Sequence, residues 1–268
     1  MARATTKKPG TAVANWDEEL AKQAEVAAAV EANTGGGQFF SVKGGILQFD
    51  GAPLPGNQAA VVIVDSIIEY IYYEGDYDPD NLQSPAAYAF GRDEDTICWH
   101  ENSIPEYAGE LCKDSDINQW GSAKKGRGKA CKNSRRLALI PAGSYNGKGD
   151  LEMFDDDDEH FHKTPIAFMK LPVTSVKGYS TFVKQVSGAL RRPPHGVFTR
   201  ISVVPDPKKQ FKVLFEVLEK VPNELMGAIM QRHTEAAAVI EFPYQPMEEA
   251  PAKPARGKAA PAKKTRKY

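Results

Sequence analysis

The sequence has few cysteines and no long apolar segment, and these absences exclude several classes of protein. Its 268 residues include only three cysteines, an odd and sparse set that does not fit a secreted disulfide scaffold. No run of about 18 apolar residues occurs, so no transmembrane helix is predicted. The basic N-terminus lacks the apolar core of a signal peptide. We therefore expect a cytoplasmic protein without membrane association.

Acidic residues are absent from residues 117–149, although the chain as a whole has a formal net charge of −1. Glycines at positions 121, 126 and 128 lie in the first half of this segment, where they allow backbone N–H groups to approach a ligand. A cationic, glycine-rich loop of this kind favours a polyanion, because each neutralised phosphate releases counterions. The alternative is a solvated loop without a partner. The cations of the segment are Lys124, Lys125, Arg127, Lys129, Lys132, Arg135, Arg136 and Lys148.

Charge is also divided into blocks elsewhere in the chain. Residues 150–159 (DLEMFDDDDE) are strongly acidic, and the tail over 251–268 is basic without any acid. A chain built from such blocks can be nearly neutral and still bind a polyanion through one of them.

Signatures of nucleotide-binding and hydrolytic enzymes are missing. No phosphate-binding loop of the Gly-x-x-x-x-Gly-Lys-Ser/Thr type and no Gly-x-Ser-x-Gly elbow occurs. Residues 155–159 with His160 and His162 leave a metal-dependent nuclease open, since clustered carboxylates can hold Mg²⁺. The alternative is a solvated acidic loop. We expect a protein without catalytic activity.

The pattern of apolar residues predicts a mainly β protein with packed helices (α+β), most simply an OB-like antiparallel barrel with long loop insertions. Alternation and β-branched runs predict strands over 38–50, 59–73, 86–90, 136–141, 166–171, 197–204 and 211–218. Helical spacing predicts helices over 16–33, 176–190 (capped by Ser175) and 222–238. The predicted organisation is a disordered N-terminus (1–14), a helix with a glycine linker (15–37), the nucleic-acid-binding domain (38–246) and a disordered basic tail (247–268).

Two stretches resemble phage and prophage single-stranded DNA-binding proteins. The first is NQWGSAKKGRGKACKNSRRLALIP, residues 118–141, and the second covers residues 165–216. The resemblance implies a sequence-tolerant single-stranded DNA-binding protein that acts in replication or recombination in the host cytoplasm. It also implies replication or recombination proteins as partners, with self-association into a homo-oligomer left open. A strand-annealing recombinase, the nuclease and a structural or RNA-binding protein remain the alternatives.

The chain departs from this family pattern at one position. The pattern has a Cys-x-x-Cys pair, whereas here Cys112 is followed by Ser115 in place of the second cysteine. A Cys3His set could still hold tetrahedral Zn²⁺, and reduced, partly buried cysteines are the alternative. The four candidate zinc ligands are Cys98, His100, Cys112 and Cys131.

Aromatic side chains next to the cationic segment are candidates for stacking on unpaired bases. Trp120 opens the segment, and the alternative for this ring is that it fills the base of the loop. Tyr70 and Tyr72 share one face of a predicted strand and are the further candidates, although one face of that strand must be core. The predicted DNA-binding residues are Trp120, Tyr70, Tyr72, Lys124, Lys125, Arg127, Lys129, Lys132, Arg135 and Arg136.

Overall fold

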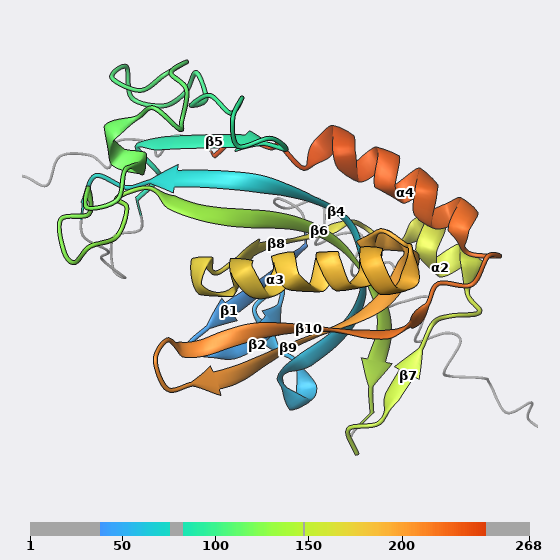
Figure 1. Ribbon diagram of the computed structural model, residues 1–268. Coiled ribbons are helices and arrows are strands. Elements are labelled where there is room, and N and C mark those ends of the chain that lie inside the picture. Colours follow the sequence, from blue (N-terminus) through green and yellow to red (C-terminus); the bar gives the residue numbers. More distant parts are fainter. Residues whose placement is uncertain (1–37, 76–82, 147, 245–268) are drawn as a thin grey trace, which may run out of the picture. The chain divides into compact units, whose positions relative to one another are not determined.

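The computed structural model describes residues 38–75, 83–146 and 148–244, which form mainly strands (Figure 1). The strands are β1 (Phe39–Lys43), β2 (Ile46–Phe49), β3 (Ala52–Pro53), β4 (Gln58–Tyr72), β5 (Ala87–Gly91), β6 (Lys132–Tyr145), β7 (Leu151–Met153), β8 (Ala167–Leu171), β9 (Val197–Asp206) and β10 (Gln210–Lys220). The helices are α2 (Asp158–Lys163), α3 (Val173–Gln185) and α4 (Met226–Val239), with the short turns η1 (Pro55–Asn57), η2 (Asp116–Asn118), η3 (Val186–Leu190) and η4 (Pro194–Gly196). The helix predicted over 16–33 and both predicted disordered ends lie outside the described residues.

The strands pair in the order β10-β9-β4-β6-β8-β1-β2-β3, with β5 beside β4 and β7 beside β6. The sheet is mixed, because β1 runs parallel to β8 while the hairpins β1–β2 and β9–β10 are antiparallel. Over the described strands, the two ends of this order, β10 and β3, do not pair with each other. The predicted mainly β fold with packed helices is therefore confirmed, whereas closure into an OB-like barrel is not.

The chain divides into two compact units. Among the described residues, unit 1 contains 38–66 and 136–240, and unit 2 contains 67–135 and 241–244. The boundaries fall inside β4 and at the start of β6, so two long strands supply residues to both units. The single domain predicted over 38–246 spans both units and stays a prediction.

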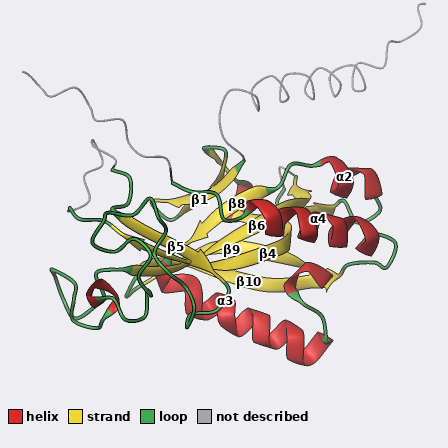
Figure 2. Ribbon diagram, turned by 90° about the horizontal axis from the view of Figure 1, so that it is seen from above, coloured by secondary structure: helices red, strands yellow, loops and turns green. Residues whose placement is uncertain are grey.

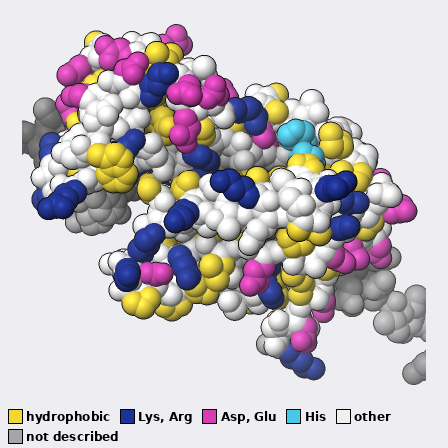
Figure 3. All heavy atoms as spheres, in the orientation of Figure 1, with side chains coloured by type: hydrophobic (Ala, Val, Ile, Leu, Met, Phe, Trp, Pro, Cys, Tyr) yellow, Lys and Arg dark blue, Asp and Glu magenta, His cyan; other side chains and the backbone are white. Residues whose placement is uncertain are grey.

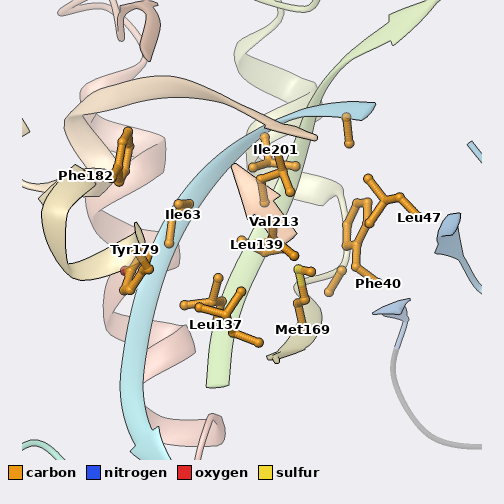
Figure 4. Packing of buried hydrophobic residues seen from close by; sticks show 14 of the residues in the cluster. Phe40, Leu47, Ile63, Leu137, Leu139, Met169, Tyr179, Phe182, Ile201 and Val213 are labelled. Atoms are coloured by element: carbon orange, nitrogen blue, oxygen red, sulfur yellow. The ribbon is translucent and has the colours of Figure 1, made fainter. Parts of the chain in front are cut away.

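Unit 1 has a continuous apolar core between its strands and α3 (Figure 4). Strands β4 and β6 supply Ile63, Leu137 and Leu139, and α3 supplies Tyr179 and Phe182. Burying one such aliphatic or phenyl side chain stabilises a fold by about 1.5–3 kcal/mol. The run of β-branched residues that predicted the strand over 59–73 therefore reflects burial, since nearly all of β4 is buried.

A single amide side chain joins two hairpins of unit 1 where strand pairing is absent. The Asn57 Oδ1 accepts the N–H of Leu47 at 2.5 Å, and its Nδ2 donates to the carbonyls of Gly45 at 2.8 Å and Val203 at 2.9 Å. The β1–β2 turn is thus held to β9 by side-chain hydrogen bonds.

The glycine pair in the predicted strand over 38–50 forms a hairpin turn. Lys43 pairs directly with Ile46, so Gly44 and Gly45 are the two loop residues, and both have positive φ (+61° and +80°). Two-residue hairpins require this backbone conformation, which favours glycine. The interruption was predicted correctly, but its interpretation as a bulge or bend within the strand was wrong.

Helix α3 packs its predicted apolar face onto the core, with Tyr179 and Phe182 nearly inaccessible to solvent. It begins at Val173, and Ser175 does not cap it: the Ser175 Oγ is buried and accepts the N–H of Val213 at 3.0 Å. Figure 2 shows α3 along one side of the strands of unit 1, with α2 and α4 together on the opposite side. Helix α4 starts at Met226, later than the predicted Pro222.

Unit 2 is built around a second apolar cluster that holds an irregular segment against β4 and β5. Trp99 and Tyr107 from this segment pack with Tyr70 of β4, and Cys112 and Cys131 complete the cluster. Such a core explains why the polar, irregular residues 92–131 keep a defined path between β5 and β6.

Candidate nucleic-acid interface

The cationic segment of unit 2 forms a closed loop between η2 and β6. The N–H of Cys131 donates to the Ile117 carbonyl at 2.8 Å, which closes its base, and the N–H of Gly121 donates to the Gly128 carbonyl at 3.0 Å. Gly121 and Gly126 have φ of +91° and +84°, a region that L side chains rarely adopt. We call residues 120–132 the basic loop.

The Ser122 hydroxyl organises the interior of the basic loop. Its Oγ accepts the N–H of Ala130 at 2.9 Å and lies 2.9 Å from the Ile117 carbonyl oxygen and 2.7 Å from that of Gln119. Buried backbone groups need such partners, because an unsatisfied one costs about 1–3 kcal/mol. The serine that follows Trp120-Gly121 in the sequence therefore has a structural role that sequence inspection missed.

Three cations are exposed at the tip of the basic loop, at Lys124, Lys125 and Arg127. Lys124 also donates its Nζ to the Glu74 carbonyl at 2.7 Å, which leaves its charge without a carboxylate in that contact. Lys132 is exposed at the start of β6, with its Nζ 5.1 Å from the Tyr73 ring centroid. The predicted phosphate-contacting role of these four side chains agrees with their accessibility.

Trp120 is the most exposed large apolar side chain of the described residues, with 80% of its surface accessible. The Nζ of Lys129 lies 6.0 Å from the centroid of its ring and 3.0 Å from the Asn118 Oδ1. The ring is therefore not a plug for the base of the loop, which was the alternative prediction. An indole left in water beside a cation is available to a flat, electron-rich partner.

The two predicted tyrosines do not share this exposure. Tyr70 is 3% exposed and packs 6.5 Å from Trp99, and its burial raises its pKa to about 12, with a smaller contribution from Glu94. The assignment of Tyr70 as a stacking ring is therefore wrong for this structure, because its face of β4 is the core face. Tyr72 is half-buried with its ring edge-on to Tyr107 at 5.9 Å.

The paired arginines at 135–136 are engaged within the protein. Arg136, which belongs to unit 1, is 3% exposed, and its Nη1 donates to the Ile240 carbonyl at 3.0 Å. Its predicted phosphate contact is wrong, since residues 136–140 of β6 are fully within the core. Arg135 is half-buried, with its Nη2 3.4 Å from the Glu94 Oε1.

The predicted zinc ligands are not arranged as a metal site. Within the described ranges, no group of three or more His, Cys, Asp or Glu side chains is placed to hold a metal ion. Cys98 is exposed, whereas Cys112 and Cys131 are buried, and burial raises the pKa of Cys112 and brings that of Cys131 to about 12. Buried thiols of this kind stay protonated, which disfavours their use as ligands. His100 stacks on Tyr88 with ring centroids 4.7 Å apart.

The acidic run of unit 1 is used within α2, where a solvated loop or a Mg²⁺ site was predicted. The Asp157 Oδ1 caps the helix by accepting the N–H of His160 at 2.9 Å. Asp158 lies 3.5 Å from the His162 Nε2, and Glu159 pairs with Lys163. These i, i+4 contacts are ordinary helix-surface pairs, and they give no support to the nuclease alternative.

Comparison with known proteins leaves the site to be judged on its own geometry. No family model, no curated protein and no solved structure matches the chain. The resemblance to phage single-stranded DNA-binding proteins therefore stays a prediction. Of the helices that the structure describes, none has the length and apolar character needed to cross a membrane.

Proposed function

We propose that this protein binds single-stranded DNA without sequence preference, through the basic loop of unit 2. The observation that carries the proposal is the position of Trp120. This indole is 80% exposed and stands beside Lys129 at the opening of a loop with three exposed cations at its tip. The cations would neutralise backbone phosphates, and the indole would stack on a base.

An exposed indole favours a single strand over a duplex. Bases in a duplex are already stacked on each other, whereas each unpaired base offers a free π-face worth about 1–3 kcal/mol on an aromatic side chain. Every base has such a face, so stacking tolerates any sequence, and phosphate contacts carry no sequence information either. The combination suits a protein that covers exposed strands during replication or recombination. An OB-like arrangement of the strands of unit 1 belongs to the same proposal.

The test is a titration of fluorescein-labelled oligo-dT and of a duplex, followed by anisotropy over a range of salt concentrations. The variant is Lys124→Ala/Lys125→Ala/Arg127→Ala. Each lost phosphate contact lowers the salt slope on a single strand by about 0.7, so the triple variant should lose about 2. Tight binding to oligo-dT and weaker binding to duplex are the expected results for the unaltered protein.

The matched control removes three exposed or half-exposed lysines elsewhere, as Lys148→Ala/Lys163→Ala/Lys220→Ala. It has the same formal charge as the loop variant, so a general effect of net charge would affect both equally. An equal loss of slope in the two variants, or a loop variant that binds oligo-dT as the unaltered protein does at every salt concentration, contradicts the proposal.

A further inference from the structure

Unit 1 carries a concentration of positive charge that is separate in sequence from the basic loop. Residues 165–216 contain nine Lys and Arg residues and only two acids, Asp206 and Glu216. Figure 3 shows Lys and Arg side chains over α3 and over the turn of the β9–β10 hairpin. The cations are Lys170, Lys177, Lys184, Arg191, Arg192, Arg200, Lys208, Lys209 and Lys212.

The amphipathic character of α3 directs two of these lysines to solvent. Tyr179 and Phe182 face the core, and each is 3% exposed. Lys177 and Lys184 are exposed, and they are seven residues apart, which places them on one face about 10.5 Å apart along the axis. This spacing gives α3 an outward row of positive charge.

The turn of the β9–β10 hairpin adds to the same surface. The Asp206 Oδ1 accepts the N–H groups of Lys208 at 2.9 Å and Lys209 at 3.1 Å, which fixes the turn. The Lys209 Nζ donates to the Thr174 carbonyl in the first turn of α3 at 3.2 Å. The hairpin turn is therefore held against the start of α3, and Lys208 is exposed there.

The two acids of the segment do not neutralise this surface. Glu216 pairs with Arg200 at 2.7 Å, and Asp206 is occupied by the turn and lies 4.0 Å from the Lys212 Nζ. Across the described part of the chain, no carboxylate lies within ion-pair distance of Lys177, Lys184 or Lys208. Like charges gathered without counter-charges repel each other, and a bound polyanion relieves that repulsion.

We propose that α3 and the β9–β10 turn form a second binding surface for the phosphate backbone of single-stranded DNA. This inference rests on the proposed function and extends it to unit 1. Among the described residues of α3 and the hairpin turn, no aromatic side chain reaches the exposure of Trp120. The surface would therefore contact phosphates alone, and it would add affinity and salt dependence without base stacking. Two surfaces on one chain raise affinity through effective concentration.

Lysine footprinting of the unaltered full chain tests this surface directly. The protein is acetylated briefly at low salt with and without oligo-dT, and each lysine is quantified by mass spectrometry. Protection of Lys177, Lys184 and Lys208 together with the loop lysines is the expected result. Lys148, Lys163 and Lys220 should react equally in both samples. Protection of Lys124 and Lys125 alone overturns the second surface and leaves the proposed function intact.

A binding titration provides the second test. The variant Lys177→Ala/Lys184→Ala/Lys208→Ala should lose about 2 from the salt slope, which corresponds to an affinity lower on the order of 100-fold at 0.1 M salt. Quenching of Trp120 at saturating oligo-dT should be unchanged, because the indole still stacks. An unchanged slope, with the Lys148→Ala/Lys163→Ala/Lys220→Ala control also unchanged, refutes the second surface. If the unaltered protein does not bind oligo-dT, the proposed function fails first.

Discussion

The ammonium group of Lys129 lies 6.0 Å from the ring centroid of Trp120, on a ring that is otherwise left in water. The Asn118 Oδ1 accepts from the same ammonium group at 3.0 Å and holds it near the ring. A cation at this distance from an exposed indole is worth about 0.5–1 kcal/mol, which is too little to explain why the ring is not buried. The arrangement is better explained as a binding surface held ready for a ligand.

Replacing Trp120 with alanine should weaken binding to oligo-dT by between about 5-fold and 150-fold, because one stacked base contributes about 1–3 kcal/mol. The free energy of unfolding should change by no more than about 0.5 kcal/mol, since the ring is exposed. Anisotropy titrations and urea unfolding measure the two quantities. Trp120→Phe is the control and should keep most of the affinity. A variant with alanine that binds as tightly as the phenylalanine variant contradicts stacking.

Replacing Ser122 with alanine tests whether the shape of the basic loop matters apart from its charge. The change removes the acceptor for the Ala130 N–H and the hydroxyl contacts to the Ile117 and Gln119 carbonyls. Hydrogen exchange at the Ala130 amide should accelerate, and oligo-dT should bind more weakly by about 0.5–1.5 kcal/mol per hydrogen bond lost. Ser187→Ala, at an exposed position of η3, is the control and should alter neither. Unchanged affinity alongside faster exchange would mean that the loop binds as a flexible chain.

The sequence predicted elements wherever one local pattern was decisive. The β-branched run of β4 and the apolar spacing of α3 lie within one or two residues of the predicted ranges or inside them. It failed where the answer depended on tertiary contacts. Two-residue spacing placed Tyr70 on a face of β4, but only the packing of Trp99 shows that this face is core. The same holds for the binding site, where local charge indicated the loop and could not distinguish exposed Lys132 from buried Arg136.

The cysteines should react as one accessible and two protected thiols. Cys98 is exposed, while Cys112 and Cys131 are buried with raised pKa values, so they lack both access and thiolate character. A thiol-reactive chromophore should label Cys98 quickly in the native protein and all three thiols in denaturant. Cys98→Ser should remove the fast phase. Protection of all three by added Zn²⁺ would contradict this assignment and restore the predicted metal site.

Arg136 and Lys132 provide a matched pair for separating structural from binding cations on β6. Arg136→Met should lower the free energy of unfolding by about 1.5–3 kcal/mol, because the Ile240 carbonyl loses a charged donor. The salt slope for oligo-dT should stay the same, since a buried guanidinium touches no phosphate. Lys132→Met should show the opposite pattern, with a slope lower by about 0.7 and nearly unchanged stability. If Arg136→Met instead lowered the slope at full stability, that side chain would reach the strand, and its burial would not persist in the bound protein.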